Sequence, residues 1–122
     1  MIRMGVMTKM FEDLQVWQSS RIVTNKVYAS FGLIKDYAFR DQIQRASVSI
    51  MNNIAEWYDR ETEKEKKRFF VMAKWSCAEV RSMLYIANDL DLIDESEFVE
   101  LKELVTTLSK QLSAFIKKFT AE

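Results

Sequence analysis

The scarcity of residues that interrupt helices is the feature that most constrains how this chain can fold. Its 122 residues include no proline and only two glycines, Gly5 and Gly32. These two residue types most often supply tight turns and break helices. The sequence therefore predicts an all-helical protein.

Length and composition limit the number of domains and the compartment. With 48% hydrophobic residues, the chain is long enough to bury one core and too short for two. We expect residues 1–10, which lack the apolar stretch of a signal peptide, to form a frayed leader and residues 11–122 to form one domain. The longest apolar run, at 69–73, is far below the roughly 20 residues that cross a bilayer, so no membrane contact is expected. Cys77 is the only cysteine, which fits a reducing, cytoplasmic compartment.

Apolar periodicity and end signals mark four helices. They are expected at about residues 13–30, 37–58 and 62–90, with a fourth that follows Asp94. Thr62 with Glu65, and Asp94 with Glu97, are spaced as capping boxes. The fourth helix carries a heptad seam of apolar residues at Phe98, Leu101, Val105, Leu108, Leu112, Phe115 and Phe119. Short connections then favour an antiparallel up-down-up-down four-helix bundle.

A line of polar residues runs along the second helix, which is otherwise apolar almost all the way round. Its members are Arg45, Ser49, Asn52, Asn53, Glu56 and Arg60. We expect Asn53 and Glu56 to face inward in a hydrogen-bonded network, because an unpaired buried amide or carboxylate is costly. The predicted polar network consists of Arg45, Asn53, Glu56, Arg60, Ser76 and Glu79.

Both middle helices carry more apolar surface than one bundle core requires, and a second subunit is the cheapest cover for it. The candidate interface residues are Trp57, Phe70, Trp75 and Tyr85. Aromatic stripes of this kind are core or interface more often than they are a ligand site.

Catalytic chemistry has little support in the sequence. The chain has no histidine, which removes di-iron Glu-x-x-His pairs, Ser-His and Cys-His nucleophile systems and imidazole zinc sites. A pair of Glu56 with Glu79 has the chemistry for acid–base work, although a structural network is the commoner role. Cys77 is expected to be a small core residue rather than a reactive thiol. We therefore expect no enzyme, no metal and no cofactor.

Charge is balanced over the whole chain but not along it. Eighteen Lys and Arg residues oppose eighteen Asp and Glu residues, which weakens a nucleic-acid role based on net charge. Residues 89–103 carry seven acidic residues and one lysine, which makes one end of the bundle acidic. The other end gathers candidate nucleic-acid contacts, or simply solvated helix ends, at Lys64, Lys66, Lys67, Arg68, Lys110, Lys117 and Lys118.

Several stretches resemble a known family. These stretches are "FEDLQVWQ" (11–18), "QIQRASVSIMNNIAE" (42–56), Arg60, and the serine and glutamate that follow "RFF" (68–79). Together they are similar to small four-helix-bundle proteins encoded in intervening sequences of bacterial large-subunit rRNA genes. That family is also similar to the accessory variability determinants of diversity-generating retroelements. The resemblance implies a homo-oligomer, with a pentamer favoured, and no known enzymatic activity. Trp57 and Trp75 depart from the pattern, because the family usually has glycine at these positions.

The sequence thus favours a non-enzymatic homo-oligomeric binding or scaffold protein that contacts rRNA or other nucleic acid through a basic rim. The alternative is an accessory subunit that docks on a partner protein, such as a reverse transcriptase, without touching nucleic acid. A small-molecule enzyme is a third possibility with no group of residues behind it.

Overall fold

A computed structural model describes residues 10–120, and these are helical apart from short connections. A 3₁₀ turn, η1 (Phe11–Asp13), precedes four helices: α2 (Gln15–Phe31), α3 (Tyr37–Asp59), α4 (Glu63–Asp89) and α5 (Glu95–Thr120). The prediction of an all-helical chain with four helices is confirmed, and the expected starts and ends lie within two residues of those observed. The predicted leader lies almost wholly outside the described residues.

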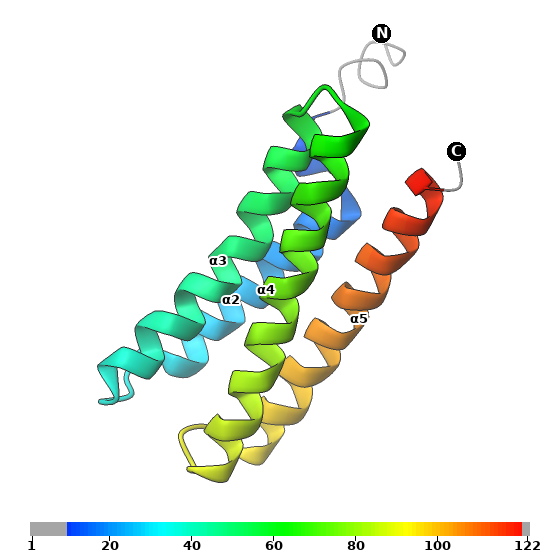
Figure 1. The fold of residues 1–122 in the computed structure, drawn as a ribbon. Helices are drawn as coiled ribbons and strands as arrows, with labels where there is room; N and C mark the ends of the chain where they lie inside the picture. The colour runs from blue at the N-terminus through cyan, green and yellow to red at the C-terminus, as the bar shows by residue number, and fades with distance from the viewer. Residues whose placement is uncertain (1–9, 121–122) are drawn as a thin grey trace, which may run out of the picture.

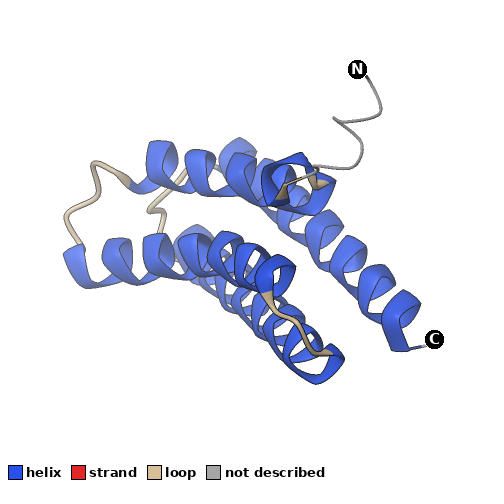
Figure 2. Cartoon of the chain, turned by 90° about the horizontal axis from the view of Figure 1, so that it is seen from above, coloured by secondary structure: helices blue, strands red, loops and turns tan. Residues whose placement is uncertain are grey.

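The four helices pack in a closed ring. α2 packs against α3, α3 against α4, α4 against α5 and α5 against α2. In Figure 1 the connections from α2 to α3 and from α4 to α5 lie at the lower end, and the connection from α3 to α4 lies at the upper end. Figure 2 shows that these connections are short loops between long helices. The arrangement is compatible with an antiparallel up-down-up-down order.

Each helix buries one apolar stripe in a shared core. On α5 the stripe is the heptad seam, and its five buried members are Phe98, Leu101, Val105, Leu108 and Leu112. Phe115 is partly buried and packs against the same core, whereas the side chain of Phe119 lies outside the described part. A seam repeating every three and four residues keeps one face of a helix against its neighbours. The heptad pattern therefore identified the core face of α5.

Both predicted capping pairs are present at the starts of their helices. The Glu97 N–H donates to Asp94 Oδ1 at 2.8 Å, and the Asp94 N–H donates to Glu97 Oε1 at 3.3 Å. The Glu65 N–H donates to Thr62 Oγ1 at 3.2 Å, but the Thr62 hydroxyl then donates to the Glu65 carboxylate at 3.0 Å. Each pair satisfies N–H groups that a helix start leaves without a partner.

The turn after α4 shows how a chain poor in glycine reverses direction. Asp91 adopts a left-handed conformation with φ 56°. The Leu92 N–H donates to Ala87 O at 2.9 Å, and the Asp91 N–H donates to Asn88 O at 3.3 Å. This is the hydrogen-bond pattern of a Schellman motif, in which glycine usually takes the left-handed position. Aspartate tolerates that conformation better than most residues, because its short polar side chain bonds locally.

Trp57 fills the upper end of the core. Its ring stacks on Phe70 with centroids 4.5 Å apart and an interplanar angle of 14°, and Phe115 meets both rings edge-on. Trp57 is 6% exposed and Phe70 is 1% exposed. Both were predicted as interface residues, but they are covered within the chain itself, so they offer almost no surface to another subunit. The large indole occupies space between α3, α4 and α5 that a glycine would leave empty.

Candidate functional site

A groove of about 790 Å³ lies between α3 and α4 on the outside of the bundle. Two residues of α3 and eight of α4 line it: Ser49, Asn53, Lys64, Lys67, Arg68, Val71, Met72, Trp75, Ser76 and Glu79. The α4 members recur at spacings of three and four, so they share one face of that helix. The groove therefore brings together residues that the sequence analysis had placed in three separate groups: the polar network, the candidate nucleic-acid contacts and the candidate interface.

The floor of the groove is a short chain of hydrogen bonds between the two helices. The hydroxyl oxygens of Ser49 and Ser76 lie 2.9 Å apart. Asn53 Nδ2 donates to Ser49 Oγ at 3.0 Å and to the Ser49 carbonyl at 2.8 Å. Contact with a carbonyl identifies this atom as the amide nitrogen, which leaves the Asn53 amide oxygen as an acceptor with no protein donor among the described residues.

Ser49 is the member of this network that sequence reasoning missed. The polar line on α3 included it, but the predicted network did not. The signal was available, because Ser49 precedes Asn53 by one helical turn and therefore shares its face. Ser49 supplies the link between Asn53 on α3 and Ser76 on α4.

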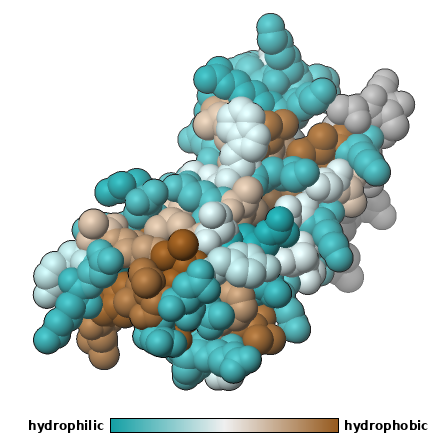
Figure 3. Space-filling model, turned by 60° about the horizontal axis from the view of Figure 1, so that its bottom comes forward, coloured by the Kyte–Doolittle hydropathy of each residue, from teal (hydrophilic) through white to brown (hydrophobic). Residues whose placement is uncertain are grey.

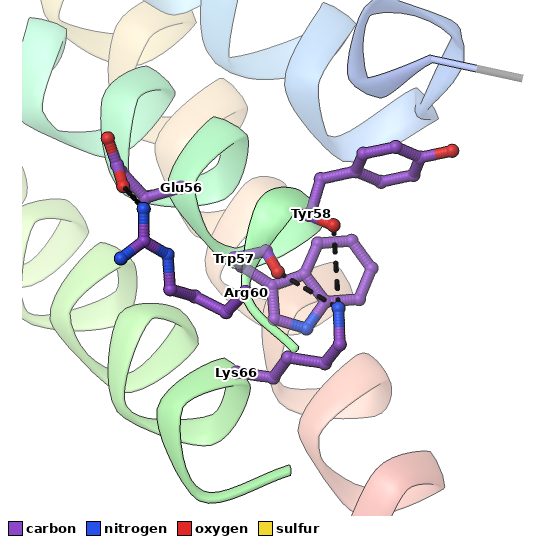
Figure 4. A network of polar contacts seen from close by, with 5 residues as sticks. All are labelled: Glu56, Trp57, Tyr58, Arg60 and Lys66. Atoms are coloured by element: carbon purple, nitrogen blue, oxygen red, sulfur yellow. Dashed lines mark hydrogen bonds and ion pairs between the residues drawn. The ribbon is translucent and has the colours of Figure 1, made fainter. Parts of the chain in front are cut away.

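The charged members of the predicted network do not join the hydrogen-bonded floor. Glu56, predicted to face inward, is exposed and pairs with Arg60, the residue directly after α3, with 2.6 Å between Oε1 and Nη2. Figure 4 shows this pair to one side of Trp57. Arg45 is exposed and does not line the groove. Glu79 does line it, and accepts a hydrogen bond from Gln42 Nε2 at 3.3 Å. Glu56 and Glu79 therefore form no acid–base pair at a common site.

Three cations stand at the end of the groove nearest the start of α4. Lys64, Lys67 and Arg68 are exposed and line the groove. The ion pairs that join described residues, such as Lys26 with Glu100, do not involve any of the three. Positive charge in the first turns of a helix interacts unfavourably with the helix dipole. The position of these three residues therefore lowers the stability of α4 rather than raising it.

Lys66, which belongs to the same basic run, has a different role. Its Nζ donates to the carbonyl oxygens of Trp57 at 3.2 Å and Tyr58 at 3.4 Å, and it lies 5.3 Å from the centroid of the Trp57 ring (Figure 4). These carbonyls belong to the last turn of α3, where a helix carries partial negative charge. Lys66 therefore stabilises the α3–α4 connection, and its ammonium group is already engaged by these carbonyls rather than by a ligand in the groove.

The basic residues of α5 lie outside the groove. Lys110 and Lys117 are exposed but are not among the residues that line it. The side chain of Lys118 lies outside the described residues. The structure thus divides the six candidate contacts whose side chains are described into three groove residues, one structural lysine and two exposed lysines of α5.

Trp75 is the large apolar side chain of the groove. It is 68% exposed, in contrast to the buried Trp57. Tyr85, another candidate interface residue, is 48% exposed on the same helix, where it contacts the Phe98 ring at 5.4 Å between centroids. Trp75 and Tyr85 thus keep accessible surface, unlike Trp57 and Phe70.

The described part of the groove holds two serine hydroxyls, and a single cysteine lies in the core nearby. The two serine hydroxyls are hydrogen-bonded to each other, and the chain has no histidine to activate them. Cys77 lies in the core, where burial raises the pKa of its thiol to about 12. Among the described side chains, no three His, Cys, Asp or Glu residues gather closely enough to hold a metal ion.

Comparison with protein families gives a match. A family model described as "23S rRNA-intervening sequence protein" matches residues 12–114. The comparison with curated proteins finds no match. None of the helices in the described part of the chain is long and apolar enough to span a membrane.

Proposed function

Since this chain belongs to the 23S rRNA-intervening sequence protein family, we propose that it is a non-enzymatic binding or scaffold protein whose α3–α4 groove contacts RNA or other nucleic acid. It acts as a single-domain antiparallel bundle in the cytoplasm. The observation that carries the proposal is the set of Lys64, Lys67 and Arg68, which lack carboxylate partners among the described residues and share one groove with an exposed tryptophan. Unpaired cations and an aromatic ring in one groove suit the phosphates and bases of a nucleic acid.

The proposed protein works as a homo-oligomer, with the pentamer that the family resemblance favours. Assembly would repeat three cations around a ring and so strengthen a field that is modest in one copy. Exposed apolar side chains on α4, including Tyr85 and Ile86, are available to meet another copy. Analytical ultracentrifugation tests this part, and a mass of one chain at every concentration would contradict it.

The nucleic-acid part is tested by fluorescence anisotropy of labelled structured RNA and duplex DNA at low and near-physiological salt. We expect saturable binding that weakens as salt rises, because bound phosphates release counterions. The variant Lys64→Glu/Lys67→Glu should abolish it. Lys35→Glu/Lys110→Glu makes the same change in charge outside the groove and serves as the matched control. Absence of binding at low salt, or equal loss in both variants, would contradict the proposal.

A second candidate function is docking on a partner protein, without contact to nucleic acid, at the end that holds the α2–α3 and α4–α5 connections. Leu33 is 96% exposed and Leu90 is 60% exposed at this end, where residues 89–103 carry a strong negative charge. Figure 3 shows hydrophobic side chains gathered there among hydrophilic ones. Such a surface fits a basic partner with apolar anchors, and a reverse transcriptase is the partner to test. The test measures binding to the purified partner protein and to nucleic acid. If changing Leu33 and Leu90 to serine abolishes binding to that protein, and the wild type binds no nucleic acid, this function is favoured.

A further inference from the structure

We propose that the α3–α4 groove takes an unpaired stretch of single-stranded nucleic acid, with one base stacked on Trp75 and phosphates a few nucleotides further along held by Lys64, Lys67 and Arg68. The inference rests on the proposed function and deepens it, because it names the class of nucleic acid and the part played by each end of the groove. Its starting point is that the cations and the aromatic ring occupy one continuous groove rather than separate surfaces.

Trp75 offers what an unpaired base requires. Its ring is 68% exposed, and the apolar side chains of Val71 and Met72 line the groove beside it. Every base has a flat face, so an exposed indole binds bases without regard to sequence. In a duplex those faces are already stacked on neighbouring bases, so a duplex offers this groove its phosphates alone.

The distance along α4 matches a short piece of single strand. Trp75 follows Arg68 by seven residues and Lys64 by eleven, which corresponds to roughly 10–16 Å along a helix axis. At roughly 3.4 Å per stacked nucleotide, this is the length of about three to five nucleotides. The volume of about 790 Å³ lies in the roughly 300–1,000 Å³ range of small-molecule pockets.

The two ends of the groove differ in charge. The cations Lys64, Lys67 and Arg68 occupy one end, whereas Glu79 lies beyond Trp75 at the other. A phosphate is attracted to the first end and repelled from the second. The Glu79 carboxylate and the open amide oxygen of Asn53 are acceptors, which suit the N–H groups on base edges, including the N3–H of uracil. Bases that reach Trp75 and Glu79 therefore meet a ring and acceptors, and the phosphates nearest the start of α4 meet cations.

The test compares a labelled single-stranded oligouridylate with an RNA duplex of equal length, by fluorescence anisotropy at low salt. Trp75→Ala should weaken single-strand binding by about 5- to 150-fold, the range for loss of one base–aromatic stack, and should change duplex binding by less than about twofold. Trp75→Phe keeps an aromatic face and should retain most of the affinity. Tyr28→Ala removes an exposed aromatic of α2 outside the groove and should leave both affinities unchanged.

The outcomes separate this inference from the function on which it rests. If the wild type binds neither probe, the proposed function itself fails. If it binds both probes and Trp75→Ala weakens neither, or weakens both equally, the single-strand inference is wrong while the nucleic-acid function stands. Ultracentrifugation of the same variants adds one more contradicting result: a change in assembly with Trp75→Ala, without a change in affinity, would show that a second copy covers the tryptophan.

Discussion

The hydroxyl groups of Ser49 on α3 and Ser76 on α4 meet at 2.9 Å, and they join the two helices at the floor of the groove. Asn53 orients this contact, because its amide nitrogen donates to both the hydroxyl and the carbonyl of Ser49. The polar floor is thus a fixed part of the α3–α4 interface, on which the exposed residues of the groove are arranged.

Asn53→Leu should lower the free energy of unfolding by about 1–2 kcal/mol, because two hydrogen bonds to Ser49 are lost and a polar interface remains around leucine. Urea denaturation measures the change. Asn52→Leu is the matched control, since Asn52 is the exposed neighbour and its replacement should change the free energy by less than about 0.5 kcal/mol. Equal effects of the two substitutions would show that the floor does not stabilise the helix pair.

Trp57→Ala should destabilise the bundle strongly, by about 3–5 kcal/mol, because it empties the space between Phe70 and Phe115. Trp75→Ala should change the free energy of unfolding by less than about 1 kcal/mol, because most of that ring is already in solvent. Thermal and chemical denaturation of the two variants give the comparison. A small loss for Trp57→Ala would contradict its place in the core.

Lys66→Met and Lys67→Met separate the structural lysine from a groove lysine. Lys66→Met should lower the free energy of unfolding by about 1 kcal/mol, because the carbonyls of Trp57 and Tyr58 lose their charged donor. Lys67→Met should leave stability within about 0.5 kcal/mol and weaken nucleic-acid binding instead. Urea denaturation and fluorescence anisotropy are measured on both variants. If Lys67→Met lowered stability and Lys66→Met weakened only binding, the assignment would be wrong.

The raised pKa of Cys77 makes stability depend on alkaline pH. Burial raises this pKa from an ordinary value of 9.0 to about 12, so the unfolded chain loses the thiol proton first as pH rises. The thiol's contribution to stability is complete below about pH 9 and falls as pH rises toward about 12. Between about pH 8 and about pH 10, the free energy of unfolding of the wild type should fall by about 1 kcal/mol more than that of Cys77→Ala. Parallel curves would show that the thiol titrates normally.

Much of the fold could be predicted because its signals are local. The capping pairs Thr62–Glu65 and Asp94–Glu97 need only a spacing of three residues, and the heptad seam of α5 needs only one apolar face. These features mark helix starts and core faces whatever the neighbouring helices do.

The misplaced side chains depend on competition between contacts. Glu56 was expected in a buried network, but Arg60, four residues later at the end of α3, pairs with it at the surface. Trp57 was expected at an interface because α3 carries more apolar residues than one core stripe requires. Its spacing from Ile50 and Ile54 nevertheless places it on the core face of α3, where a space between three helices accepts the indole.

The candidate site could be predicted only as separate residues. The sequence indicated five of its residues separately: Lys64, Lys67, Arg68, Trp75 and Asn53. They line one groove only because of the way α3 is rotated against α4. The roles of Lys66 and Ser49 depend on the same packing, since each makes its contacts across the helix pair or its connection. No pattern within a single helix carries that information.

The most direct test of the account is to locate bound nucleic acid on the bundle. A single-stranded RNA that contains 5-bromouridine is irradiated with the wild-type protein, and cross-linked peptides are identified by mass spectrometry. The account predicts cross-links within residues 64–79, centred on Trp75 and lost in Lys64→Glu/Lys67→Glu. Cross-links confined to residues 89–103 or to α5, with none in the groove, would contradict it.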